Sequence, residues 1–267
     1  MKKQLSLFLC ILAMPIIFLA CKKDDEGKTT INIFSIEDDI KMGKQMDTYF
    51  RDSAGYVILS REQYPKAYNY IDNIKNQILN SGAIRYKNEF EWKIAIIRDD
   101  STLNAFATPG GYIFVYTGLM KYLDCDDHFA GVLGHEMAHS DKRHSTNQLT
   151  KQYGVSTLLG IILGNGTISQ VSQSLLGLKF SRDDENDADK YSVKYLCHVN
   201  QVSADGAAGF FEKLISSGNS ANIPQFLSTH PSSENRVENI KKIAQEEGCS
   251  TQQVCDTEYQ AVINSLP

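Results

Sequence analysis

The stretch that decides this fold is Gly134-His-Glu-Met-Ala-His-Ser140, near the middle of the chain. His135 and His139 are four residues apart, so on an α-helix they project from one face, one turn apart. Two imidazoles in that arrangement can ligate one zinc ion, and Glu136 beside the first can act as a general base. The motif therefore predicts one face of a catalytic zinc site.

The residues before the motif favour a helix. Phe129, Val132 and Leu133 are apolar at helical spacing, and Asp126 with Asp127 is expected to cap the helix start. A His pair with an adjacent Glu also arises by chance in unrelated helices, so the motif needs support from the rest of the chain.

A His pair leaves a catalytic zinc ion one protein ligand short. The best candidate for the third ligand is Glu185, in the acidic segment 181–190. Asp189, four residues later, shares its helix face and can hydrogen-bond the outer nitrogen of a ligand histidine. The alternative is a solvated acidic helix face, because five of the seven residues from Asp183 to Asp189 are acids.

Two strands are expected before the motif. Trp92, Ile94 and Ile96 alternate onto one side of a strand over 91–97, and 112–116 is a second strand. Pro109, followed by two glycines, marks a turn and a sheet edge, because proline donates no ladder hydrogen bond. An edge beside a metal helix is a place where an extended polypeptide substrate can add as a strand; an ordinary hairpin is the alternative.

Helices dominate the remaining chain. Ser35 is expected to cap a helix, and a second helix spans 64–80 with an apolar stripe. The apolar stretch 158–178 is broken by glycines and too short to cross a bilayer, so it forms either a core hairpin of helices or a flap, membrane-facing or over the site. The fold class is therefore α+β, mostly helical, with a small β-sheet.

The N-terminus has the features of a targeting segment. Residues 1–20 carry Lys2 and Lys3 before an almost wholly apolar run, and Cys21 follows Ala20. This ending resembles a bacterial lipobox, which predicts lipidation of Cys21, a tether over 21–35 and a membrane-anchored protein of the cell envelope, on the outer membrane or in the periplasm. An ordinary secretory signal or an uncleaved anchor are the alternatives.

Four cysteines fall outside these segments, at positions 125, 197, 249 and 255. An even number in an exported protein favours disulfides. Cys249 and Cys255 could close a small loop, which would leave Cys125 with Cys197. The sequence leaves the connectivity open, and four buried thiols are the alternative.

The composition is that of a folded protein. The 267 residues are 42% hydrophobic and 22% charged, and the net charge is −5. There is no basic stripe, which argues against nucleic acid as a partner.

Three separated motifs together resemble one zinc metallopeptidase family, which includes HtpX-type membrane proteases, CAAX prenyl proteases and periplasmic lipoprotein-type members. The first is H-E-x-x-H-x-x-x-x-H, the second S-R-x-x-E-x-x-A-D and the third T-H-P followed by an arginine. The matching residues are His135, Glu136, His139 and His144; Ser181, Arg182, Glu185, Ala188 and Asp189; and Thr229, His230, Pro231 and Arg236.

The resemblance implies a gluzincin fold and a set of roles. His135, His139 and Glu185 would bind one zinc ion per chain, with Glu136 as general base. Asp189 would support a ligand histidine.

The third motif implies roles for two more residues. His230 would approach the zinc as an inhibitory ligand or, swung away, would stabilise the oxyanion, as would Arg236. His144 is expected to be structural, because five residues beyond His139 it faces another side of the helix. His128 and His198 match no motif.

The expected function is zinc-dependent endoproteolysis of extended or misfolded envelope proteins by a domain spanning 36–248, followed by a C-terminal tail, 249–267. Three alternatives remain: a latent homologue that acts mainly as a client-binding chaperone, a structural zinc module, and a helical lipoprotein scaffold without metal.

Overall fold

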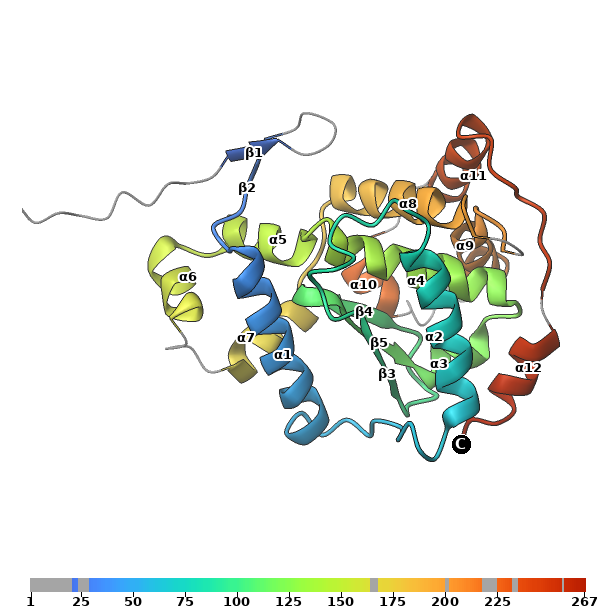
Figure 1. Ribbon diagram of the computed structural model, residues 1–267, viewed down its shortest axis with the longest axis horizontal. Coiled ribbons are helices and arrows are strands. Elements are labelled where there is room, and N and C mark those ends of the chain that lie inside the picture. The colour runs from blue at the N-terminus through green and yellow to red at the C-terminus, as the bar shows by residue number, and fades with distance from the viewer. Residues whose placement is uncertain are drawn as a thin grey trace, which may run out of the picture.

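The computed structural model describes residues 21–23, 29–163, 168–199, 202–217, 225–231, 235–255 and 257–267 (Figure 1). The predicted signal segment, 1–20, lies outside the described residues. Within the predicted tether, β1 (Cys21–Lys23) pairs antiparallel with β2 (Thr29–Ile31). Lipidation of Cys21 stays a prediction.

Helices make up most of the described chain. Their bounds are α1 Ile36–Asp52, α2 Pro65–Leu79, the 3₁₀ turn η1 Pro109–Gly111, α3 Thr117–Tyr122, α4 Asp126–Asp141, α5 His144–Gln152, α6 Val155–Ile162, α7 Ile168–Leu176, α8 Arg182–Leu196, α9 Gly206–Ser216, α10 Gln225–Thr229, α11 Arg236–Glu246 and α12 Thr257–Ile263. The predicted helices at 36–50 and 64–80 are confirmed, and Ser35 forms a capping box with Asp38.

A three-stranded sheet lies beside the metal-motif helix, in the order β3-β5-β4. β3 (Lys93–Ile97) runs parallel to β5 (Tyr112–Tyr116), and β4 (Ala105–Thr108) runs antiparallel to it. Both predicted strands are confirmed. β4 is an edge strand that ends at Pro109, where the sequence placed an edge.

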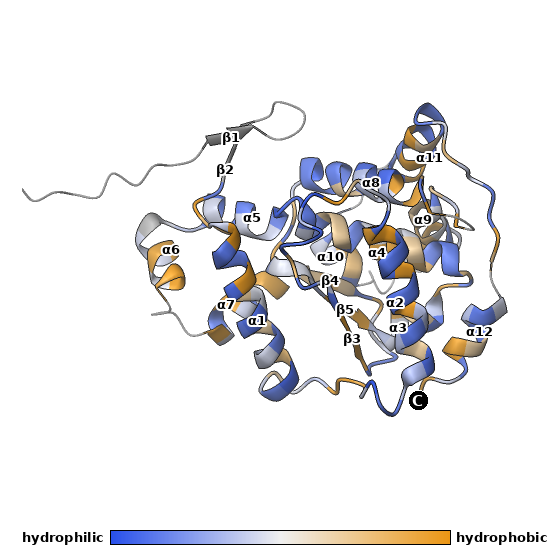
Figure 2. Ribbon diagram, viewed as in Figure 1, coloured by the Kyte–Doolittle hydropathy of each residue, from blue (hydrophilic) through white to orange (hydrophobic). Residues whose placement is uncertain are grey.

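Both faces of the sheet are buried, and successive side chains of each strand point to opposite faces. Ile94, Ile96 and Val115 join the main core formed with α2, α4, α8 and α9. Ala95 and Phe114 point to the opposite face, where α1 and α7 cover them. Figure 2 shows the strands as hydrophobic, with hydrophilic residues on the outward faces of α2 and α8. The fold is thus the expected mostly helical α+β domain.

Helix α4 runs through the centre of the domain, between α8 and α9. Its N-cap is Cys125, without a side-chain cap bond, so the predicted capping by Asp126 and Asp127 was wrong. Both acids lie inside the first turn and are buried, where Asp127 accepts hydrogen bonds from distant backbone amides instead. A Cβ on Gly131 would lie 2.0 Å from the backbone nitrogen of Ala207, so a larger residue would push α9 away.

The apolar stretch 158–178 forms α6 and α7 against α1. Leu158 and Val171 are buried in the cluster that α1 shares, whereas Leu163 is largely exposed. Core packing is therefore confirmed for parts of both helices, whereas the connection between them, 164–167, lies outside the described residues. In the part of the chain that the structure describes, no helix combines the length and apolarity needed to cross a membrane.

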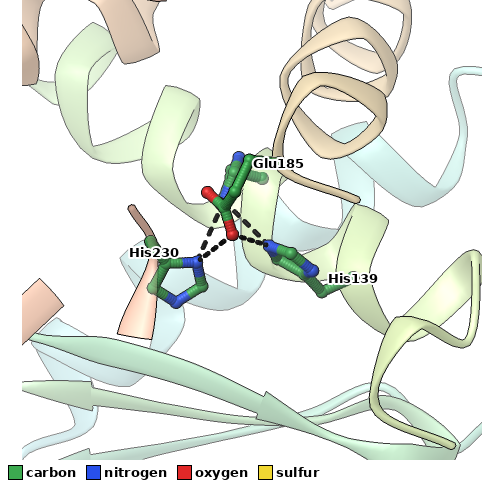
Figure 3. A group of neighbouring side chains, drawn as sticks. His139, Glu185 and His230 are labelled. Atoms are coloured by element: carbon green, nitrogen blue, oxygen red, sulfur yellow. Dashed lines mark hydrogen bonds and ion pairs between the residues drawn. The ribbon is translucent and has the colours of Figure 1, made fainter. Parts of the chain in front are cut away.

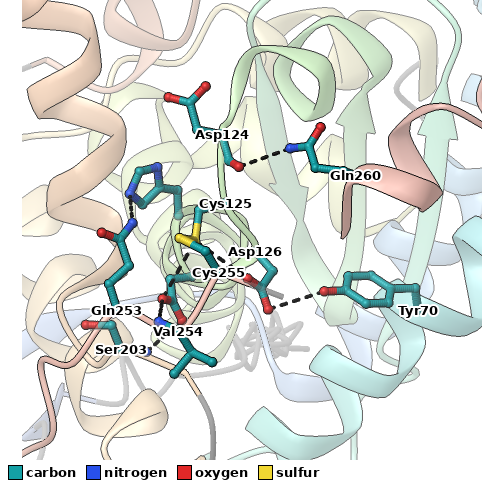
Figure 4. The surroundings of a disulfide bond; sticks show 11 residues. Tyr70, Asp124, Cys125, Asp126, Ser203, Gln253, Val254, Cys255 and Gln260 are labelled. Atoms are coloured by element: carbon teal, nitrogen blue, oxygen red, sulfur yellow. Dashed lines mark hydrogen bonds between the residues drawn. A yellow bond between two sulfur atoms is a disulfide. The ribbon is translucent and has the colours of Figure 1, made fainter. Parts of the chain in front are cut away.

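Two disulfides attach the C-terminal residues to the domain, and Figure 4 shows the one between Cys125 and Cys255. Cys125 is bonded to Cys255, and Cys197 to Cys249. The suggested pairs Cys249–Cys255 and Cys125–Cys197 were therefore wrong. The reason is that residues 249–255 run between the N-terminal end of α4 and the C-terminal end of α8. The predicted tail packs back on the domain, since Tyr259 of α12 is buried and donates to the carbonyl of Met120.

These crosslinks make a testable prediction. The Cys125→Ser/Cys255→Ser double variant should lose about 2–4 kcal/mol of unfolding free energy, because a long closed loop is released in the unfolded state. Urea denaturation measures the loss. Peptide mapping without reductant should recover the two cross-linked pairs, and a Cys249–Cys255 peptide would contradict the pairing.

Candidate metal site

Four buried side chains from three segments converge at the centre of the domain. His135 and His139 come from α4, Glu185 from α8, and His230 directly follows α10. Each offers one ligand atom, and these atoms lie within 4.8 Å of one another. Figure 3 shows His139, Glu185 and His230 pointing toward one another. The structure therefore brings together all three predicted metal ligands and His230.

The spacing of the donor atoms fits a metal ion. Nε2 of His139 lies 3.0 Å from Nε2 of His135, and Oε1 of Glu185 lies 3.0 Å from Nδ1 of His230. Nε2 of His135 is 3.4 Å from Nδ1 of His230 and 3.4 Å from Oε2 of Glu185. A tetrahedral zinc ion with bonds of about 2.0–2.1 Å has its ligands about 3.3 Å apart. Imidazole nitrogens and a carboxylate are also the ligand types of catalytic zinc.

Burial and neighbouring side chains together shift the pKa values of the cluster. Desolvation pushes the pKa of Glu185 upward, but the charge of His230 and hydrogen bonds from three histidines outweigh it and hold the pKa well below its usual value. Burial lowers the pKa of His139 well below the ordinary value, and His135 adds to this effect. Burial and the charge of Arg236 lower the pKa of His135, but its hydrogen bonds with Asp189 and Glu185 outweigh them and raise it to about 9. Glu185 and His139 therefore have the protonation states that a metal requires, whereas His135 would have to give up a proton to bind one.

Asp189 supports the first ligand histidine, as its position predicted. Its Oδ1 lies 2.8 Å from Nδ1 of His135, on the side of the ring away from the cluster. The carboxylate is held in turn by Arg236, whose Nε and one terminal nitrogen donate at 2.6 and 2.8 Å. This contact fixes the ring of His135 with Nε2 toward the other ligands.

Arg236, the second candidate oxyanion donor, is buried against two carboxylates. It is 2% exposed, it pairs with Asp189, and its terminal nitrogen is 2.9 Å from Oε2 of Glu185. Its guanidinium also stacks on the ring of Phe211, 4.2 Å from the centroid. These contacts are those of a residue that orients two carboxylates. The oxyanion role stays a prediction.

Glu136 lies beside the cluster and does not take part in its hydrogen bonds. Among the described residues no donor satisfies either carboxylate oxygen, although the side chain is 1% exposed. Nε2 of His230 lies 3.5 Å from Oε1 of Glu136. Burial raises the pKa of Glu136, and the charges of His230 and His135 offset part of the rise. A buried carboxylate with a raised pKa and accepting oxygens is suited to take a proton from water.

Local sequence signals place the supporting elements. Ser181 caps α8 in a reciprocal box with Asp184, which starts the helix one turn before Glu185. Ser140, directly after the second ligand histidine, accepts from the amide of Gly111 and donates to the carbonyl of Thr108. The last turn of α4 therefore holds the end of edge strand β4 next to the site.

Two phenylalanines pack against the cluster, and neither of them was predicted from the sequence. Phe180 stacks on His139 with 4.0 Å between ring centroids, and Phe226 stacks on His230 at 4.3 Å. The amide of Phe180 donates to the carbonyl of Thr229, which ties the segment before α8 to α10. Their only signal in the sequence is their position next to the second and third motifs.

The expectation for His144 was wrong in its geometry. Helix α4 ends at Asp141, and Arg143 adopts a left-handed backbone with φ 59° and ψ 33°. This turn brings His144 back against His139, with 2.9 Å between their Nδ1 atoms. A continuous helix would have pointed it elsewhere. His128 and His198 stand apart from the cluster, beside Gln253 and the carbonyl of Lys194.

Comparison with known proteins gives a consistent result. The model of peptidase family M48 matches residues 65–244. Metalloprotease YcaL of Escherichia coli is 31% identical over 199 residues, which cover 71% of this chain and 74% of YcaL. Mitochondrial metalloendopeptidase OMA1 of Schizosaccharomyces pombe is 30% identical over 65% of this chain and 52% of its own. The E. coli beta-barrel assembly-enhancing protease is 26% identical over a region that covers 82% of this chain and 46% of that protease.

The chain thus spans about half the length of the OMA1 and assembly-enhancing relatives. The matched region contains the predicted ligands His135, His139 and Glu185, together with Asp189, His230 and Arg236. The resemblance drawn from the three motifs is confirmed: this chain belongs to peptidase family M48.

Proposed function

We propose that this chain is a zinc-dependent endopeptidase that cleaves extended or misfolded polypeptides. The observation that carries the proposal is the pairing of a buried His/His/Glu donor set with Glu136, whose oxygens accept no hydrogen bond from the described residues. A purely structural zinc site has no use for such a carboxylate. The same observation disfavours a scaffold without metal.

His135, His139 and Glu185 would hold one zinc ion per chain. When bound, zinc would act as a Lewis acid toward the attacking water and the scissile carbonyl. Asp189 would keep His135 in the tautomer that offers Nε2, and Arg236 would fix that carboxylate. The protein's contribution is therefore a set of ligands already oriented before the metal arrives.

Glu136 would move the proton. It would take one from the attacking water and then deliver it to the leaving amine. Its raised pKa brings the acid and base forms closer in energy, which suits both transfers. His230, with Nε2 at 3.5 Å from Glu136, is placed to donate to the oxyanion once it leaves the ligand cluster.

The substrate would bind as an added strand on β4. β4 is an edge of its sheet, and its far end is tied to α4 through Ser140. Backbone pairing at an edge reads no side chain, so it suits extended or unfolded segments of varied sequence.

The proposed location is the cell envelope, with a lipid on Cys21 as anchor. The sequence of residues 1–21 supports the anchor. One E. coli relative is named for enhancing β-barrel assembly, and single-chain bacterial β-barrels belong to the outer membrane. Misfolded envelope proteins are accordingly the proposed clients.

The first prediction concerns the base. Glu136→Gln should retain zinc but lose cleavage of an unstructured fluorogenic peptide by about a hundredfold or more, since the amide cannot accept the proton. The matched control is Glu62→Gln, at an exposed residue outside the metal cluster. A Glu136→Gln variant with full residual activity would remove Glu136 from the mechanism.

A second candidate function is a latent protease that mainly binds clients. The specific observation is His230, which sits among the three ligands with Nδ1 3.0 Å from Glu185 and so would occupy the position that a substrate or water needs. In this form the chain would act as a chaperone until His230 moves.

Caseinolysis by His230→Ala, beside the control His198→Ala, separates these roles. If His230 blocks the site, activity should rise by about tenfold when the competent state is a tenth of the population. If His230 is an oxyanion donor, activity should fall by about a hundredfold. No activity in wild type and variant would favour the client-binding function.

A further inference from the structure

The three motif histidines and an aspartate form a continuous line of contacts. Nε2 of His139 faces the ligand cluster, 3.0 Å from Nε2 of His135. On the other side of the ring, its Nδ1 lies 2.9 Å from Nδ1 of His144. Nε2 of His144 then lies 3.2 Å from Oδ2 of Asp187 on α8. The protein thus gives His139 a partner on its outer nitrogen, as Asp189 is for His135.

Hydrogen-bond chemistry assigns a single proton arrangement to this line. A neutral His139 that offers its Nε2 lone pair to a metal carries its proton on Nδ1. This N–H donates a hydrogen bond to His144. His144 must then accept on Nδ1 and carry its own proton on Nε2. That proton points at the Asp187 carboxylate, which can only accept. Each ring therefore has one tautomer, and the acid at the end selects both.

We propose that His144 is a positioning residue for the metal site, which fixes the tautomer and ring orientation of His139. The proposal rests on the proposed function, since it takes His139 as a metal ligand. It replaces the expectation that His144 is merely structural. Both α4 histidines then present Nε2 to the ion because an acid of α8 holds their outer nitrogens, directly at His135 and through His144 at His139.

The contact between His139 and His144 requires a strained backbone conformation at Arg143. Arg143 is a non-glycine residue in the left-handed region, a conformation that persists only where surroundings hold it. Its guanidinium is held by the buried carboxylate of Asp39 on α1, at 2.6 Å, and by the carbonyl of Phe34, also at 2.6 Å. Helix α1 thereby fixes the turn that returns His144 to His139.

The surroundings leave the His144 ring little freedom. It is 4% exposed, and Phe180, stacked on His139, lies 6.4 Å from it between centroids. A residue that only filled this space could be replaced by an apolar side chain of similar size. A residue that accepts a hydrogen bond from His139 could not be replaced in this way. This difference makes the proposal testable.

The experiment measures zinc affinity of the mature full chain by competition with a chromophoric chelator. His144→Leu keeps the bulk but removes the acceptor, so zinc affinity should fall by about 10- to 100-fold, the usual effect of losing such a partner. His144→Asn places an amide oxygen near the position of Nδ1 and should restore most of the affinity. Asp187→Ala should produce a smaller loss. His198→Asn, on an exposed histidine, is the control.

The outcomes separate the two proposals. Wild-type zinc binding, weakened in His144→Leu and recovered in His144→Asn, supports the positioning role. Affinity in His144→Leu within about threefold of wild type would overturn it, as would an equal loss in both variants, which would indicate only damaged packing. A wild-type chain that binds no zinc would instead overturn the proposed metal site itself.

Discussion

The ionised carboxylate of Glu185, almost fully buried among three histidines, is the group on which the rest of the structure depends. Transferring such a charge from water into a protein interior costs several kcal/mol unless it is compensated by charge and hydrogen bonds. Here His135, His139 and His230 provide that compensation on one side. Arg236 provides it on the other, where it also pairs with Asp189.

The helices, disulfides and hydrogen bonds of the domain position these charged groups. α4 supplies the paired histidines, α8 supplies three acids, and the first residue of α11 is the arginine that joins two of them. Each ligand-bearing helix is fixed at its far end by a disulfide to the same segment, 249–255. Ser140 ties the near end of α4 to the end of β4, which places the edge strand beside the site. Donor groups that are held together in this way would bind an ion without a large rearrangement of the chain.

Much of this arrangement follows from local rules that can be read in the sequence. Spacing of four places His135 with His139 and Glu185 with Asp189, and a capping box starts α8 at Ser181. What escaped prediction depends on contacts between distant segments. The pairing of Cys125 with Cys255 requires knowing where residues 249–255 run. The return of His144 requires a left-handed Arg143, whose side chain is held by Asp39, Phe34 and Ser35, more than a hundred residues earlier in the chain. Phe180 and Phe226 carry no periodic signal and become part of the site only after α10 has packed on the segment before α8.

The most direct test of this account is the metal content of the purified mature chain, measured by elemental analysis for wild type and Glu185→Ala side by side. Glu62→Ala, at an exposed position, controls for the loss of a carboxylate. The account predicts one zinc ion per wild-type and Glu62→Ala chain, and its loss or a sharply weakened affinity in Glu185→Ala. Zinc retained at full affinity in Glu185→Ala would contradict the three-ligand site and reduce Glu185 to a buried structural acid.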